Sequence, residues 1–225
     1  MLPIVMPCVN CVSYSKQAVA SAHPRSDLYF IDNASTDGTR EWAQAEANAG
    51  RLRYLPQRYN LGVAASWNLG IRKAFADGHD SVLVSNNDVV YDVDTIPNLE
   101  RWHEETGGFI TVHSVAYLET LLKQARRHVL EQPPDFAGFV ISRKIFEMIG
   151  PFDEGFRQAY FEDLDYVIRM KDADIVYGRA MNSLVLHYHS RTVHEGGVKA
   201  FPQQELNRRR FIAKWGQQRL QEVGQ

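Results

Sequence analysis

The stretch Val82-Leu-Val-Ser-Asn-Asn-Asp-Val-Val90 joins an apolar run to a polar strand end. The apolar run is rich in β-branched residues and predicts a buried strand. Two amides and a carboxylate follow, and these side chains are costly to bury without partners. Ligands of open α/β sheets bind beyond the carboxyl ends of the strands, so Asp88 is predicted to hold a divalent cation against a phosphate. The alternative is a polar turn that only ends the strand.

Apolar strands and amphipathic helices alternate on both sides of this stretch. Turn residues separate the segments, with Gly50 and Gly78 ending two of the helices. This alternation predicts βαβ units, and therefore an α/β fold with a mostly parallel central sheet flanked by helices. Because such units cross over right-handed, the loops after the first, second and fourth strands are expected on one rim. The predicted strands are 4–6, 27–31, 51–55 and 82–85, and the predicted helices are 14–22, 42–49 and 63–77.

Length and charge limit the classes of protein. A chain of 225 residues can bury one sizeable core, and the absence of linkers or repeats predicts a single domain over residues 1–225. The net charge of -2 provides no overall field for nucleic acid or an anionic membrane. Local basic clusters such as Arg208–Arg210 are interpreted as solvated helix faces.

Membrane and targeting signals are not found in the sequence. No apolar run has the length of a membrane span, and Met1 is followed directly by the strand-like residues 4–6. These features predict a cytoplasmic protein without an integral membrane segment. Cys8 and Cys11 form a Cys-x-x-Cys after the first strand, where a thioredoxin-type motif would lie. No second pair exists for zinc, so reduced thiols in a loop are favoured over redox chemistry.

Polar residues also follow the first two strands. Asp32 ends the second strand and is expected to accept a hydrogen bond from a pyrimidine N3–H, beside a loop of Pro7, Cys8 and Asn10. Ser35 and Asp37 have an alternative use as a helix N-cap. Neither a G-x-G-x-x-G after a strand nor a G-x-x-x-x-G-K-[ST] occurs, which disfavours Rossmann dehydrogenases and P-loop NTPases.

Four motifs together resemble family 2 glycosyltransferases of the GT-A fold. They are residues 31–39, the run Tyr59-Asn-Leu-Gly-Val-Ala-Ala-Ser-Trp-Asn-Leu-Gly-Ile71, the Asn86-Asn87-Asp88 strand end and the later Glu162-Asp-x-Asp165. The resemblance implies a single GT-A domain, with a nucleotide-binding half over about 1–92 and a catalytic and acceptor half over about 93–225. It covers nearly the whole chain.

The resemblance also implies roles for individual residues. Asp32 would read the base, Asn60 and Gly62 would line the nucleotide, and residues 86–88 would take the place of the Asp-x-Asp motif that holds ribose and metal. Here Asn86 stands at the first position of that motif. Only Asp88 then brings charge to a manganese or magnesium ion, so weak or partly dispensable metal binding is expected.

The second half of the chain is predicted to carry the chemistry. Residues 109–112 form a predicted strand and residues 116–131 a predicted amphipathic helix. Residues 136–143 resemble the family's strand beside the donor sugar, where Gly138 lets the backbone come close. Residues 175–177 and 183–187 are predicted as two short strands, and 203–223 as a final helix.

Glycosyl transfer needs a base to take the proton of the acceptor hydroxyl. The resemblance assigns this role to Asp163, while Glu162 and Tyr160 are expected to contact the acceptor. Capping of a helix N-terminus is the alternative use of these carboxylates. Asp165 is expected to pair with Arg169 at i+4.

The resemblance implies a metal-binding histidine after the last strand. His187 is favoured over His189 as the companion of Asp88, although a histidine after an apolar strand is more often a core residue. Arg191, Thr192, the Gly196-Gly197 turn and Lys199 are predicted to form a loop that closes over the diphosphate.

The predicted function is inverting transfer of a sugar from a nucleoside-diphosphate sugar to an acceptor hydroxyl. A UDP-sugar is favoured, with GDP- and dTDP-sugars as alternatives. A glycan or lipid-linked hydroxyl is the expected acceptor, and a modified nucleic acid is a less favoured one. The alternative functions are a sugar-1-phosphate nucleotidyltransferase and a non-catalytic nucleotide- or sugar-binding protein.

Overall fold

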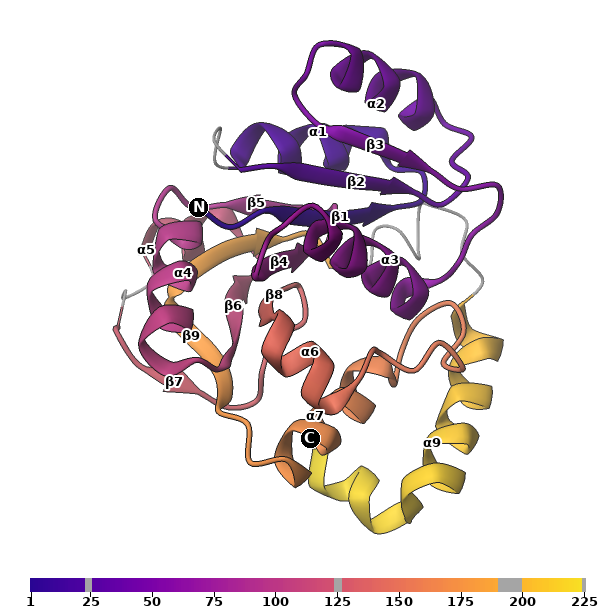
Figure 1. The fold of residues 1–225 in the computed structure, drawn as a ribbon, viewed down its shortest axis with the longest axis vertical. Helices are drawn as coiled ribbons and strands as arrows, with labels where there is room; N and C mark the ends of the chain where they lie inside the picture. The colour runs from indigo at the N-terminus through magenta and orange to yellow at the C-terminus, as the bar shows by residue number, and fades with distance from the viewer. Residues whose placement is uncertain (23–25, 124–126, 190–199, 224–225) are drawn as a thin grey trace.

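A computed structural model describes residues 1–22, 26–123, 127–189 and 200–223, built around one central sheet (Figure 1). Its N-terminal half is parallel, in the spatial order β3-β2-β1-β4. These strands are β1 (Ile4–Cys8), β2 (Leu28–Asp32), β3 (Arg53–Pro56) and β4 (Ser81–Ser85). Because they run in parallel, their carboxyl ends lie along one rim, as predicted.

The C-terminal half of the sheet is mixed. Beyond β4 lie β8 (Gly138–Ser142), β6 (Phe109–Val115), β9 (Tyr177–His187) and β5 (Val89–Tyr91). Strand β8 is antiparallel to both neighbours and β6 is parallel to β9. Strands β5 and β7 (Leu130–Glu131) are both antiparallel to β9.

Helices cover both faces of the sheet (Figure 1). One face packs against α1 (Val12–Ser21), α2 (Thr39–Asn48) and α4 (Thr95–Thr106). The other packs against α3 (Val63–Ala76), α6 (Arg143–Ile149) and α7 (Glu162–Asp172). Alternation along β1 explains this division, since Ile4 and Met6 point into the first layer and Val5 into the second. The predicted α/β fold is confirmed.

Two predicted elements of the second half were wrong. Residues 116–131 do not form one helix: α5 spans Leu118–Lys123, and Leu130–Glu131 pair with β9 instead. Leu118 and Val129 are exposed whereas Leu121 is buried, so the expected apolar stripe is packed only in part. The two short strands expected at 175–177 and 183–187 are one strand, β9, which is almost wholly buried.

Several elements were not predicted. Helix α4 packs Ile96 and Leu99 into the core, and β5 and α6 complete the sheet edge and the second helical layer. Helix α9 (Ala200–Val223), by contrast, corresponds to the final helix predicted at 203–223. It packs against α7 and changes direction at Gly216, whose φ is 85°. Within the described residues, no helix combines the length and apolar character needed to cross a membrane.

Candidate active site

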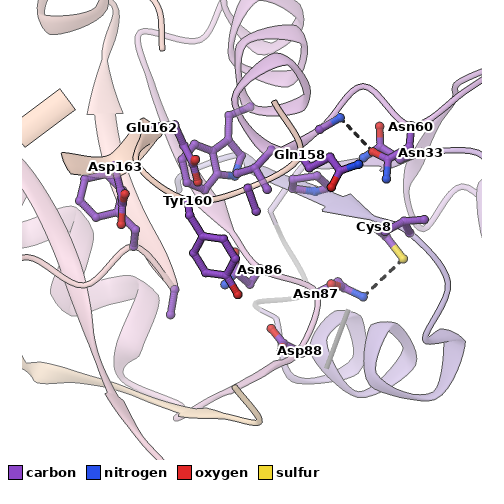
Figure 2. Close-up of a pocket in the computed structure, with 18 of the residues that line it drawn as sticks. Cys8, Asn33, Asn60, Asn86, Asn87, Asp88, Gln158, Tyr160, Glu162 and Asp163 are labelled. Carbon is purple, nitrogen blue, oxygen red and sulfur yellow. Dashed lines mark hydrogen bonds between the residues drawn. The ribbon is translucent and has the colours of Figure 1, made fainter. Parts of the chain in front are cut away.

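A cavity of about 320 Å³ opens at the carboxyl ends of β1 and β4 (Figure 2). Strand ends, the start of α3, the loop before α7 and the end of β9 all contribute side chains to it. These segments lie far apart in the sequence and meet because parallel strands bring their ends to one rim. The cavity is therefore placed where the fold predicts a ligand.

Most of the predicted site residues line this cavity. They come from all four predicted groups, for nucleotide, acceptor, metal and catalysis: Pro7, Cys8, Asn60, Gly62, Asn86, Asn87, Asp88, Tyr160, Glu162, Asp163 and His187. Three predicted residues are not among the lining residues, namely Asn10, Asp32 and Gly138.

Asp32 is fully buried beneath the cavity rather than facing it. One of its carboxylate oxygens accepts a hydrogen bond from the Ser35 N–H at 2.8 Å, and the other accepts from the Tyr54 hydroxyl at 2.7 Å. Both oxygens thus hold the turn after β2 and the neighbouring strand. The structure thus gives Asp32 partners within the protein, and its contact with a base stays a prediction.

Asn10 and Gly138 also support the site from outside it. Asn10 accepts a hydrogen bond from the Thr36 N–H at 2.7 Å, and its own N–H donates to Ser35 Oγ at 2.8 Å. It therefore links the two loops that follow β1 and β2. A Cβ on Gly138 would lie 3.1 Å from a methyl group of Val112, so the absence of a side chain allows β8 to pack closely on β6.

The cavity also contains residues that the sequence did not reveal: Val9, Asn33, Val63, Trp67, Phe136, Ala137, Gln158 and Ala159. Asn33 follows Asp32 directly, and its Oδ1 accepts hydrogen bonds from Ser66 Oγ at 3.0 Å and from the Leu61 N–H at 3.3 Å. Its neighbour in the motif was the signal that could have identified it. Gln158 had no such signal, because its position depends on the conformation of a loop.

Asp88 and His187 are brought together by strand pairing. Strand β5 pairs with β9 in a register that sets Val89 opposite His187, and the Tyr188 N–H donates to the Asp88 carbonyl at 3.0 Å. As a result, His187 Nε2 lies 3.2 Å from Asp88 Oδ1. The exposed His189 has its ring centroid 4.6 Å from that of His187.

This donor set fits a divalent cation that is shared with a substrate. A carboxylate and an imidazole at contact distance match the ligands that manganese accepts. The described residues contain no group of three or more His, Cys, Asp or Glu side chains arranged to hold a metal. Magnesium-type sites commonly combine one or two carboxylates with substrate phosphates and waters, and these two residues suit such a shared site.

Cys8 lies at the cavity wall as a buried thiol. Its Sγ donates to the Asn10 carbonyl at 2.9 Å and accepts from Asn87 Nδ2 at 3.4 Å (Figure 2). Burial raises the pKa of the Cys8 thiol well above its usual range. A neutral thiol is a poor nucleophile, so this environment disfavours the redox alternative.

Glu162 and Asp163 occupy the first turn of α7 at the other part of the cavity (Figure 2). Burial raises the pKa of Glu162 to about 8, and the neighbouring Asp163 carboxylate adds to the effect. Burial also raises the pKa of Asp163, opposed by hydrogen bonds from backbone N–H groups such as that of Leu164, 2.8 Å from Oδ1. Glu162 Oε2 is buried without a hydrogen-bond partner. Glu162 is therefore expected to hold a proton near neutral pH.

Asp165 faces away from the cavity and is fully buried. Its carboxylate pairs with Arg169 at 2.9 Å, which confirms the predicted i+4 pair. The predicted closing loop of Arg191, Thr192, Gly196, Gly197 and Lys199 lies outside the described residues.

Comparison with known proteins identifies the family. The sequence profile described as "Glycosyl transferase family 2" matches residues 4–167. No curated protein is detectably similar to the chain in sequence.

Solved structures share the fold at low sequence identity. GalNAc-T7, solved with UDP, GalNAc and Mn2+, superposes with a TM-score of 0.68 at 11% identity, over 83% of this chain and 43% of that one. The mannosyltransferase PcManGT from Pyrobaculum calidifontis, solved with GDP-Man and Mn2+, superposes with a TM-score of 0.64 at 15% identity. The match covers 93% of this chain and 64% of that one. S. aureus TarS (1–349), solved with UDP, superposes with a TM-score of 0.60 at 15% identity. The match covers 92% of this chain and 64% of that one.

The chain thus spans less than two thirds of the length of these structural relatives. Their fold is the GT-A fold that the sequence motifs implied. With the family profile matched over most of its length, the chain belongs to glycosyl transferase family 2.

Proposed function

We propose that this protein transfers a sugar from a nucleoside-diphosphate sugar to an acceptor hydroxyl, with inversion at the anomeric carbon. The observation that carries the proposal is the composition of the cavity wall. Amides suited to a nucleotide, a carboxylate–imidazole pair suited to a cation, and a pair of carboxylates with raised pKa line one cavity.

The nucleotide is assigned to the part of the cavity around Asn33, Asn60 and Pro7. Asn33 Oδ1 already accepts two hydrogen bonds, which leaves its Nδ2 group to donate to a carbonyl oxygen of the base. Uracil, thymine and guanine all present such a carbonyl. Relatives solved with UDP and with GDP-Man are consistent with this range, and a UDP-sugar is the favoured donor.

The diphosphate requires positive charge that the described wall does not supply. Among its described residues there is no lysine or arginine, whereas Asp88, Glu162 and Asp163 are acidic. Asp88 and His187 are therefore assigned to a manganese or magnesium ion, which would offset the charge that develops on the departing nucleotide. Two relatives with the same fold were solved with Mn2+.

Asp163 is assigned as the general base. Its carboxylate takes the proton of the acceptor hydroxyl while the acceptor oxygen bonds to the anomeric carbon. The bond from that carbon to the diphosphate oxygen breaks, and the nucleoside diphosphate leaves with the electron pair. A single displacement of this kind inverts the anomeric configuration. Glu162 and Tyr160 line the same part of the cavity and are assigned to acceptor hydroxyls.

A donor screen tests the proposed function. The protein is incubated with UDP-, GDP- and dTDP-sugars and Mn2+, and released nucleoside diphosphate is measured, with heat stabilisation by each nucleotide as an independent measure of binding. We expect turnover of at least one donor and a product of opposite anomeric configuration by NMR. Release of pyrophosphate from a nucleoside triphosphate would instead indicate a nucleotidyltransferase. Binding without any turnover of the donors would indicate a non-catalytic protein.

A further inference from the structure

The loop that carries the cavity-lining residues Gln158 and Tyr160 has an unusual backbone. Gln158, Tyr160 and Phe161 have φ values of 61°, 78° and 76°. The left-handed region is unfavourable for residues with a Cβ, so each of these conformations must be held by its surroundings. The loop also leads directly into Glu162 and Asp163, so its conformation decides where those carboxylates lie.

One buried side chain on α9 holds this loop. Asn207 is 1% exposed, and its Nδ2 group lies 2.9 Å from the Arg157 carbonyl oxygen, 3.0 Å from that of Ala159 and 3.0 Å from that of Tyr160. Three carbonyl groups thus converge on one amide that is about 50 residues away in sequence. Only a donor group can satisfy them, because all three are acceptors.

The orientation of this amide is set by a neighbour on the same helix. Gln203 Nε2 donates to Asn207 Oδ1 at 3.0 Å. This contact turns the Asn207 amino group toward the loop and removes the reverse orientation, in which two acceptors would face each other.

The other side of the loop rests on the start of α3. The Val63 N–H donates to the Gln158 carbonyl at 2.7 Å. A Cβ on Gly62 would lie 2.8 Å from the Gln158 backbone nitrogen, so glycine is needed for this approach. The loop is thus clamped between Gly62 at the nucleotide part of the cavity and Asn207 on α9.

Helix α9 packs against α7 and contacts both flanks of the loop through side chains. Before it, Asp153 pairs with Arg210 at 3.1 Å and with Lys214 at 2.9 Å. After it, Trp215 Nε1 donates to Asp165 Oδ1 at 2.8 Å. These contacts join α9 to both flanks of the loop, so the Asn207 amide is well placed to define the position of the loop.

We propose that Asn207 is a positioning residue, whose amide holds the 157–161 loop so that Glu162, Asp163 and Tyr160 take their places in the cavity. The claim that this placement affects turnover rests on the proposed glycosyl transfer; the claim that Asn207 orders the loop does not. Asn207 does not itself line the cavity, and it contacts the lining residues Ala159 and Tyr160 only through their backbone carbonyls. Its effect must therefore pass through the loop.

The test compares Asn207→Asp with a matched control. The variant keeps the shape but places a carboxylate against three carbonyl oxygens. Asn98→Asp also places a carboxylate against a carbonyl oxygen, at a position that does not line the cavity. The half-buried Asn98 donates through Nδ2 to the Asn182 carbonyl at 2.8 Å. A misplacement of about 1 Å can lower a rate about a hundredfold. We expect Asn207→Asp to lower kcat about ten- to hundredfold with little change in the donor KM, and Asn98→Asp to leave both unchanged.

Gln203→Ala provides a milder variant in case Asn207→Asp does not fold. Loss of the orienting contact is expected to lower kcat by a smaller factor, with binding of UDP and Mn2+ retained. Equal effects of Asn207→Asp and Asn98→Asp on kcat, or a loss confined to the donor KM, would overturn the proposal.

Hydrogen exchange separates this proposal from the proposed function. Backbone amides of residues 158–163 are expected to exchange faster in Asn207→Asp, while the amides of β1 and β4 stay protected. This result is expected even if the wild-type protein turns over none of the donors. Unchanged exchange of that segment in a folded variant would contradict the positioning role, whatever the activity.

Discussion

Asp32 and Asn33 are consecutive in the sequence, yet only Asn33 lines the cavity. Both carboxylate oxygens of Asp32 accept hydrogen bonds, one from the Ser35 N–H and one from the Tyr54 hydroxyl. These bonds fix the turn that presents Asn33. Alternate residues at a strand end point to opposite sides. A motif alone therefore does not show which of two consecutive residues lines a cavity, because the direction of the side chain is not known from sequence.

Glu162 shows how a single buried carboxyl links stability to pH. Its pKa is about 8 in the folded protein against an ordinary value of 4.5. Between these two values the folded state holds more protons than the unfolded state, so the free energy of unfolding falls as pH rises through this interval. The contribution of Glu162 to the stability of the folded protein is thus lost at alkaline pH.

Glu162→Gln is expected to remove this dependence, because the amide does not ionise. The melting temperature of the variant should be close to that of the wild type near about pH 5 and exceed it by several degrees near about pH 8, given about 2–4 °C per kcal/mol for a chain of this size. The measurement is thermal unfolding across that range without nucleotide. Glu147→Gln, at an exposed glutamate, is the control and should show no such divergence. A constant difference between wild type and Glu162→Gln at all pH values would contradict the buried, protonated carboxyl.

At the scale of elements, the pairing of β5 with β9 builds the cation site. From the sequence, Asp88 was predicted at a strand end and His187 was favoured over His189 as its companion, but strand β5 was not predicted. Without β5, nothing in the sequence sets the register that brings His187 to Asp88. His189 follows the end of the strand, is exposed and has a φ of 52°.

This geometry predicts different effects for the two histidines. His187→Ala should weaken the added heat stabilisation that Mn2+ gives in the presence of UDP, whereas His189→Ala should leave most of it intact. The measurement is a melting-temperature titration with UDP, with Mn2+ and with both, since a ligand that binds the folded state raises its stability by mass action. A larger loss of the stabilisation by Mn2+ in His189→Ala than in His187→Ala would assign the cation to His189.

Helix α3 lies against the sheet at Gly70, which also positions Gly62 and Val63 at the cavity. A Cβ on Gly70 would lie 2.2 Å from Val5 Cγ1 and 2.9 Å from Ile31 Cδ1. Gly70→Ala is therefore expected to destabilise the protein by about 1–3 kcal/mol through overpacking. Helix propensity alone predicts the opposite, a gain of about 1 kcal/mol.

Thermal or urea unfolding distinguishes these two outcomes. Adding Val5→Ala to Gly70→Ala should recover part of the stability, because the smaller side chain leaves room for the new methyl group. A rise in stability from Gly70→Ala alone would show that the helix can move away from the sheet.

At the scale of the whole molecule, the first half of the chain was predicted well from sequence. Strands β1, β2 and β4 are buried apolar runs, and local patterns suffice to identify such elements. The carboxyl-end rule then placed Asn86, Asn87 and Asp88 correctly at the cavity. Asp163 also lines it, as the resemblance implied.

The second half was predicted less well because its structure depends on distant contacts. The helix expected at 116–131 had an apolar pattern, but part of that segment pairs with β9 instead. Gln158 enters the cavity through a loop in the left-handed region, which no local propensity favours for residues other than glycine. The amide of Asn207 that holds this loop comes from the last helix. Such positions follow from the assembled fold rather than from any local stretch.

In the proposed reaction, different residues of one cavity bind the nucleotide and remove the proton of the acceptor hydroxyl. The most direct test compares Asp163→Asn with the wild type in two measurements, the affinity for UDP with Mn2+ and the rate of sugar transfer. The account predicts an affinity within about threefold of the wild type and a transfer rate lowered by about 10²- to 10⁴-fold, the range expected for loss of a general base. Near-normal transfer by Asp163→Asn would contradict the account.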